Sequence, residues 1–389
     1  MQGTSTAASP ASMTISHQDW SSRVAQGAAA LVLVASVACE HSSPAEPEPP
    51  QALPPVSSGS PVRLTFNRAD DRTPSWLPDG SGIIYSSERQ DRSDRDRCLN
   101  VLPARGGTIS TSYCQYNPIY DDSTDLMESP AQHADGRLFY HRIISWVGQQ
   151  KLGASALVVG TRENPLQATL VQPLPYTAPN GRFHSSIRTP QWIGRDSLLY
   201  LAEQLFYEGS TFFPDTFYTG LDAAILDLSG GTPRVEVIPG TDYASGVALG
   251  EDSQTIYYTL GGDSRVYRRS LSSGEVTILY DFGTGTIVRD PQVRGTRLVA
   301  VVGGSVLYRF EDAHGNVQRD EGGDLMFVNL SDGSSRLFRG DSVLFRHPII
   351  SPDGSHVVVE VQPFAPVHGE PDSDFNAPNH RADLWLFAM

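Results

Sequence analysis

Histidines are the side chains of this sequence best suited to acid–base or metal chemistry, because a neutral imidazole is both a general base and a metal ligand near neutral pH. They are spread along the chain, in loops or at the starts of apolar stretches. Those of interest are His133, His141, His184, His347, His368 and His380. Their spacing matches no metal-binding motif, so they either meet in the folded chain or lie exposed one by one.

A second candidate is the acidic stretch "EPDSDFN", 370–376. Asp372, Asp374 and Asn376 alternate as oxygen ligands do in a calcium-binding loop, but the stretch lacks the central glycine and the distal glutamate of such a loop. A solvated acidic loop is the competing interpretation. We therefore predict no metal site and no cofactor.

Known catalytic motifs are missing. The sequence has no G-x-S-x-G elbow, H-E-x-x-H pair, G-x-x-x-x-G-K loop or C-x-x-C pair. Asp-Gly pairs do recur, but in tight turns the aspartate bonds its own backbone and the glycine supplies a positive φ. We assign them to structural turns and predict no catalytic residue. The pairs are Asp79-Gly80, Asp135-Gly136 and Asp353-Gly354.

The turns belong to a repeat. "TPSWLPDGSGIIYSSE" at 73–88 returns as "HPIISPDGSHVVVEV" at 347–361, and intermediate copies lie between them. In each, a short strand, a turn and a second strand are followed by an apolar run that ends in a turn. The spacing of about 44 to 60 residues is typical of four-stranded propeller blades. The six units are anchored at Pro74, Pro130, Pro190, Val247, Pro291 and Pro348.

The last unit stops after its third strand, "DLWLF", whereas "PVRLTF" at 61–66 belongs to no unit. A terminal strand of this kind closes a propeller by covering an open sheet edge. Together with "DLMFVNLSDG", these phrases resemble the TolB-like propeller repeats of bacterial envelope proteins, over roughly residues 60–389. The resemblance implies an all-β, six-bladed TolB-like β-propeller whose last blade is completed by the N-terminal strand.

Two functions follow from the resemblance. One is a non-enzymatic scaffold that binds a protein or peptide segment of the cell envelope, which agrees with the missing catalytic motifs. The other, the enzymatic alternative, is a metal-dependent polysaccharide lyase or glycan-binding propeller, because oligogalacturonate lyases resemble this fold and use a histidine cluster to hold a metal. We predict the scaffold, acting as a monomer.

The first residues form a separate segment. "VAQGAAALVLVASVAC" at 24–39 follows Arg23 and is too short to span a bilayer comfortably. It resembles a lipoprotein signal with Cys39 as the lipid attachment site; an ordinary cleaved signal is the alternative, and Met1 or Met13 is the start. We predict a disordered signal at 1–39, a Pro-rich linker at 40–60 and the propeller at 61–389. The protein is then exported, to the periplasmic side of the outer membrane or the cell surface, with the lipid as its only membrane contact.

Composition agrees with this scheme. The 35 glycines and 28 prolines provide many turns, and 39% hydrophobic residues allow a large core. The 44 acidic and 29 basic residues give a formal net charge of −15, so the basic surface of a nucleic-acid-binding protein is missing.

Cysteine placement predicts a disulfide. Cys98 and Cys114 flank "LNVLPARGGTISTSY", and a three-residue turn at 105–107 sets them directly opposite on antiparallel strands. Opposed residues have the separation that a disulfide needs, and an exported compartment lets it form. Two buried free thiols are the alternative.

Insertions predict a binding face. Extra length falls at 87–97, 203–222, 310–324 and 362–383, on the side of the ring opposite the Asp-Gly turns. One-sided variable loops are typical of a working surface. We expect this face to bind a partner, and a basic one because the loops are acidic, unless the aromatics fold back as a plug or a satellite core. The candidates are Phe206, Tyr207, Phe212, Phe213, Phe217, Tyr218, His368, Asp372, Asp374 and His380.

Overall fold

The computed structural model describes residues 60–66, 69–88, 97–114, 123–146, 153–210, 213–303, 308–311, 317–320, 322–340, 343–363 and 382–389. All of them lie in the second of two compact units, Pro47–Met389; the first is Met1–Glu46. Their regular structure is entirely β-strand, as predicted, and they contain no helix that could cross a membrane. The signal segment with Cys39 and nearly all of the linker lie outside the described residues.

Three sheets are four-stranded antiparallel meanders. Their strand orders are β16(Ala244–Leu249)-β17(Thr255–Leu260)-β18(Arg265–Ser270)-β19(Val276–Asp281), β20(Val288–Arg294)-β21(Arg297–Val302)-β24(Asp324–Asn329)-β25(Ser335–Phe338) and β1(Val62–Arg63)-β28(Asp383–Ala388)-β27(His356–Pro363)-β26(Val343–Ile350).

Two larger sheets contain the same meander with additions. In the eight-stranded sheet a single parallel contact, Arg97 with Leu126, joins two meanders. These are β2(Asp71–Trp76)-β3(Gly82–Glu88)-β4(Arg97–Pro103)-β5(Thr111–Tyr113) and β6(Ser123–Gln132)-β7(Leu138–Trp146)-β8(Gly153–Gly160)-β9(Thr169–Leu174). The six-stranded sheet is β12(Ser186–Ile193)-β13(Ser197–Ser210)-β14(Phe213–Asp227)-β15(Arg234–Val237), with β22(Tyr308–Glu311) and β23(Val317–Asp320) added to β14. A two-stranded sheet pairs β10(Tyr176–Thr177) with β11(Phe183–His184).

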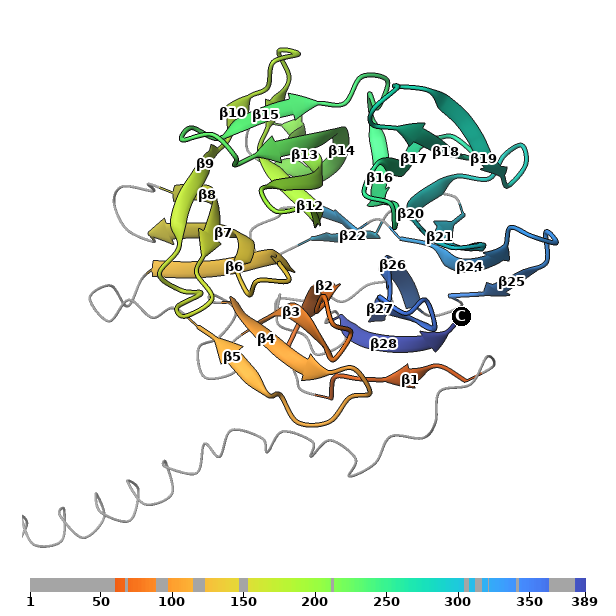
Figure 1. The fold of residues 1–389 in the computed structure, drawn as a ribbon, viewed down its shortest axis with the longest axis horizontal. Coiled ribbons are helices and arrows are strands. Elements are labelled where there is room, and N and C mark those ends of the chain that lie inside the picture. The colour runs from red at the N-terminus through yellow and green to blue at the C-terminus, as the bar shows by residue number, and fades with distance from the viewer. Residues whose placement is uncertain are drawn as a thin grey trace, which may run out of the picture. The chain divides into compact units, whose positions relative to one another are not determined.

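The sheets follow one another around a common centre in a propeller-like arrangement (Figure 1). Second strands are apolar and buried: all of β3 except Glu88 is buried, and so is all of β21 except Arg297. They pack between neighbouring sheets, where each buried Leu, Ile or Phe contributes about 1.5–3 kcal/mol. One such layer joins Phe139 of β7 to Leu198 of β13, and another joins Ile83 of β3 to Val358 of β27.

The Asp-Gly pairs form tight turns between first and second strands. Gly80, Gly136 and Gly354 have φ of 72°, 95° and 71°, where a side chain would be strained. Each aspartate accepts a backbone N–H two residues later, as Asp79 does from Ser81 at 2.9 Å and Asp353 from Ser355 at 2.9 Å.

The N-terminal strand closes the C-terminal sheet. Val62 pairs with Leu386 and Arg63 with Trp385, so β1 covers the outer edge of β28 (Figure 1). Beyond the strand, the Leu64 N–H donates to the Leu384 carbonyl at 2.7 Å. This pairing agrees with the expected role of "PVRLTF", which was to cover the open edge of the last sheet.

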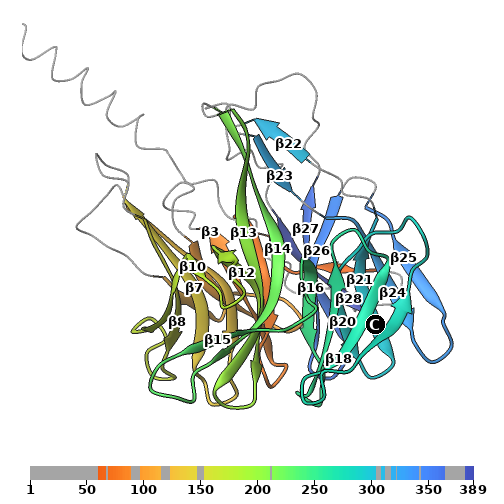
Figure 2. The same cartoon turned by 90° about the horizontal axis from the view of Figure 1, so that it is seen from above.

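One expected loop is in fact a hairpin. Residues 203–222, treated as an inserted loop, prolong β13 and β14, which stay paired as far as Ser210 and Phe213. Figure 2 shows both strands extending past their neighbours on one side, with β22 and β23, from the 310–324 insertion, beside them. Aromatic and β-branched residues favour extended structure, so an insertion rich in them lengthens the strands.

The predicted disulfide is confirmed. Cys98 and Cys114 are bonded, with 4.6 Å between their Cα atoms. The register is the expected one, because Asn100 faces Ser112 and Leu99 faces Tyr113 across β4 and β5.

Candidate functional site

The first strands of the meanders surround the centre. β2, β6, β12, β16, β20 and β26 contact one another in a closed series, β26 returning to β2. Five of them, all but β16, carry a β-bulge at which a non-glycine residue with positive φ precedes a proline. Such a conformation costs about 1–3 kcal/mol and is held only by its surroundings. The residues are Thr73 (48°), Ser129 (50°), Thr189 (46°), Asp290 (45°) and His347 (47°).

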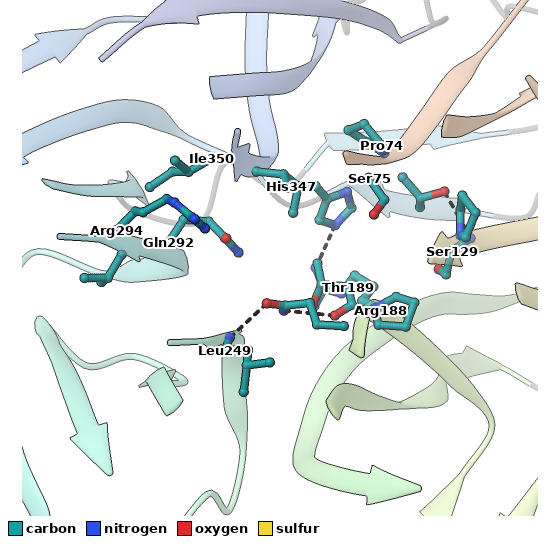
Figure 3. Close-up of a pocket in the computed structure, with 16 residues that line it drawn as sticks. Pro74, Ser75, Ser129, Arg188, Thr189, Leu249, Gln292, Arg294, His347 and Ile350 are labelled. Atoms are coloured by element: carbon teal, nitrogen blue, oxygen red, sulfur yellow. Dashed lines mark hydrogen bonds between the residues drawn. The ribbon is translucent and has the colours of Figure 1, made fainter. Parts of the chain in front are cut away.

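A cavity of about 120 Å³ lies where these strands meet (Figure 3). Four of the bulge residues, Thr73, Ser129, Thr189 and His347, line it together with Arg188. The bulges therefore aim polar side chains at the centre of a ring whose other lining residues include prolines, Leu249 and Ile350.

His347 is the best-positioned acid–base group of the cavity. Its Nδ1 lies 3.0 Å from Oε2 of Glu360. Its Nε2 lies 3.2 Å from Nη1 of Arg188, as Figure 3 shows. The Thr73 N–H donates to the same Oε2 at 3.2 Å. A neutral imidazole with its proton on Nδ1 satisfies both contacts, and leaves Nε2 as a base directed toward the cavity.

Glu360 is held as a carboxylate. It is 1% exposed, and it pairs with Arg346 as well as His347. Burial opposes its ionisation, but the charge of Arg346 and the hydrogen bond from His347 outweigh burial and keep the pKa of Glu360 well below its usual range. It is therefore ionised near neutral pH and orients the imidazole.

Arg188 joins His347 to a second carboxyl. Its Nε lies 2.6 Å from Oε1 of Glu203 and its Nη1 lies 4.0 Å from Asp290. Burial raises the pKa of Glu203 above its usual range, against the effect of Arg188. The guanidinium can hold a developing negative charge.

Three other candidate histidines that the structure describes lie elsewhere. Nε2 of His141 lies 2.7 Å from Ser155 Oγ, and burial lowers the pKa of His141 to about 4. His184 lies between Asp222 and Tyr176, at 3.0 and 2.7 Å. Nε2 of His133 lies 3.0 Å from the Gly194 carbonyl.

The described residues can be searched for a group of side chains that would hold a metal ion. Among the described residues, no group of three or more His, Cys, Asp or Glu side chains could hold a metal ion. His368, His380, Asp372 and Asp374 lie outside the described residues, so the structure does not test the metal-dependent lyase that was the alternative.

The predicted binding face is also untested. Phe206, Tyr207, Phe213, Phe217 and Tyr218 fall on the extended part of β13 and β14, where Phe206 pairs with Phe217 and Leu205 with Tyr218. Only the backbone of this part is described, and Phe212 lies outside. The expected partner protein and monomeric state stay predictions.

The central residues Arg188, Glu203 and Glu360 were missed from the sequence. A signal was present for Arg188 alone: a charged residue stands two positions before the proline in five of the units, in "RTP" twice, "ESP", "RDP" and "RHP". The prolines indicate the repeat, and this pattern alone gives the charged residues near them no role.

Comparisons with known proteins bear on the fold. No family model matches the chain, and no curated protein matches it. A gluconolactonase from Xanthomonas campestris is 12% identical, with a TM-score of 0.50, and the match covers 89% of this chain and 99% of that one. A luciferin-regenerating enzyme is 11% identical (TM-score 0.47; 85% and 96% covered). TolB from Acinetobacter baumannii is 15% identical (TM-score 0.39; 75% and 60% covered).

The chain has the fold of a β-propeller. Its structural neighbours include TolB and other propellers. At these identities the likeness shows the fold alone.

The prediction of a non-enzymatic scaffold is wrong. It rested on missing motifs and on the resemblance to TolB, but the match with a TM-score of 0.50 is to a gluconolactonase. Enzymes use this fold, and a catalytic site built from residues far apart in the sequence leaves no short motif.

Proposed function

We propose that this chain is an enzyme that hydrolyses a small ester or lactone at the central cavity. The observation that supports this best is the arrangement around His347, in which the Glu360 carboxylate is on one ring nitrogen and the Arg188 guanidinium is beside the other. A carboxylate that fixes the tautomer of a base next to a cationic donor is the combination acyl transfer requires.

His347 and Arg188 have separate roles in the proposed reaction. A water molecule gives a proton to Nε2 of His347 while its oxygen attacks the substrate carbonyl carbon. The carbonyl oxygen becomes negative and is stabilised by Arg188, which turns from Nε2 to the substrate. The carbon–oxygen single bond then breaks, and the leaving oxygen takes the proton from Nε2. The product is a hydroxy acid from a lactone, or an acid and an alcohol from an ester.

Lactones are the first substrates to test, because a structural neighbour with a TM-score of 0.50 is named a gluconolactonase. Purified protein is mixed with a panel of lactones and short esters, and acid release is followed at constant pH. We expect His347→Ala to lower the rate at least about a hundredfold, as loss of a general base does. Glu360→Gln is expected to lower it less, because the imidazole remains.

His133→Ala is the matched control, since His133 bonds a turn carbonyl and does not line the cavity. Its rate is expected to equal that of the unaltered protein. The proposal fails if the unaltered protein hydrolyses nothing in the panel, or if His347→Ala retains full activity while folded.

We also propose that the propeller has six blades. Support comes from the six first strands in a closed series and from β1, which gives the β26-β27-β28 sheet its fourth strand. Export and a lipid on Cys39 are part of the same proposal, supported by the apolar stretch before Cys39. Cys39→Ala is expected to move the protein from the membrane to the soluble fraction; membrane retention of that variant would contradict the anchor.

A further inference from the structure

The cavity is lined by cations although the protein is acidic. The formal net charge of the chain is −15, yet the lining contains Arg188, Arg294 and His347 and no Asp or Glu. Oε1 of Glu251 lies 3.0 Å from Nε of Arg294. No other described residue bonds this guanidinium. An anion in the cavity therefore meets donors and no carboxylate in direct contact.

Two polar groups of the lining have no partner among the described residues. Gln292 is 8% exposed, and its amide bonds no described residue. By contrast, Gln191 accepts the Leu249 N–H at 2.8 Å and donates to the Val247 carbonyl at 3.3 Å. Thr189 Oγ1 is buried and has no described partner. Buried polar groups are nearly always satisfied, so Thr189 Oγ1 can bond a ligand that enters the cavity, and so can the Gln292 amide on the same lining.

The unsatisfied groups are arranged around one space. Gln292 and Arg294 lie next to each other on one side of the cavity, and Thr189 and Arg188 lie on another (Figure 3). Gln292 and Arg294 follow the bulge of β20, at the end where the strand runs into its short turn.

We infer that the cavity binds a small hydroxy acid as its carboxylate. Arg294 and the Gln292 amide donate to the carboxylate, and Thr189 bonds the hydroxyl group. A volume of about 120 Å³ equals that of about four water molecules at liquid density, which suits an acid of three or four carbons. The inference rests on the proposed function, because such an acid is what hydrolysis of a small lactone or hydroxy ester releases.

Calorimetric titration of the full-length protein with lactate at neutral pH tests this without any measurement of turnover. Lactamide, which keeps the hydroxyl and lacks the charge, and inorganic phosphate are the comparison ligands. We expect lactate to bind at one site, and lactamide and phosphate at least about tenfold more weakly. Gln292→Leu and Arg294→Gln should each weaken lactate at least about tenfold, since each removes donors to a charged group.

Arg297→Gln is the matched control. Arg297 lies on the next strand and donates to the Gly354 carbonyl at 2.5 Å, outside the cavity lining, so its lactate affinity should stay within about twofold of the original. Equal binding of lactamide, tighter binding of phosphate, or unchanged affinity in folded Arg294→Gln would overturn the inference. Lactate binding without hydrolysis of any ester would overturn only the proposed function, and hydrolysis without lactate binding would overturn only this inference.

Discussion

The pKa of a charged residue in this protein can depend on burial as much as on its partners. Asp383, at the start of β28, accepts a hydrogen bond from Arg63 at 2.8 Å and a weaker one from Thr65 at 3.4 Å. Burial nevertheless raises the pKa of Asp383 to about 6, with Arg63 opposing the shift and the nearby Asp70 adding to it. Desolvation of this carboxylate outweighs its ion pair.

The shift at Asp383 predicts a stability that falls as the pH rises. The pKa in the folded protein, about 6, is above the reference value of 3.8, so protonation favours the folded state. This contribution is complete below the reference value and is lost as the pH passes 6. Between pH 4.5 and 7.5, we expect the unaltered protein to lose roughly 1–3 kcal/mol more unfolding free energy than Asp383→Asn.

Urea unfolding at the two pH values measures this difference. Asp242→Asn is the control, because the Asp242 side chain is 62% exposed in its pair with Arg182, and it should follow the unaltered protein. Equal pH dependence in Asp383→Asn and the unaltered protein would show that the carboxyl titrates normally.

Among the elements, β5 depends most on a covalent link. It has three residues, all exposed or half-buried, and forms the outer edge of its meander. Few apolar contacts hold such a strand in place. The Cys98–Cys114 bond, with a sequence separation of 16, ties it to β4, whose residues are mostly buried.

Replacing both cysteines with alanine should therefore lower stability. A loop of this length is expected to contribute about 3 kcal/mol by restricting the unfolded chain. The measurement is thermal unfolding of Cys98→Ala/Cys114→Ala beside the unaltered protein, with and without a reductant. The reductant should lower the melting temperature of the unaltered protein only; if it changes neither protein, the bond makes no contribution.

In the whole molecule, the two ends of the described chain are joined in one sheet. Val62 and Leu64 are 5% and 1% exposed, and Leu64 packs with Leu384 and Leu386 of β28. Asp70 also accepts the Ala382 N–H at 2.9 Å. Closure thus depends on residues more than 300 positions apart, a contact that forms only when the intervening sheets are in place.

Deletion of residues 60–66 tests this closure. It exposes the edge of β28 and removes two buried aliphatic side chains, which are worth about 3–6 kcal/mol together. We expect a lower melting temperature and concentration-dependent association through the open strand edge. Adding a peptide with the sequence of residues 60–66 should restore part of the stability; an unchanged melting temperature in the deletion protein would show that β1 is dispensable.

The strands, their turns and the disulfide could be derived from the sequence because they depend on short-range patterns. The alternation in "GIIYSSE" and the Asp-Gly pairs act within a few residues, and the repeat shows them several times. The register of β4 and β5 follows from one turn, which is why Cys98 and Cys114 were paired correctly. Even the role of residues 61–66 was accessible, because a unit one strand short implies a missing partner.

The candidate site was decided by the tertiary structure alone. Arg188 and Glu203 come from one unit, and His347 and Glu360 come from another. The contact between Arg188 and His347 exists only after the ring brings β12 and β26 together. No local pattern specifies which histidine receives an ionised carboxylate, because burial and neighbouring charge arise from chain segments far apart in sequence. The same holds for Gln292, whose place in the cavity lining depends on strands from several units.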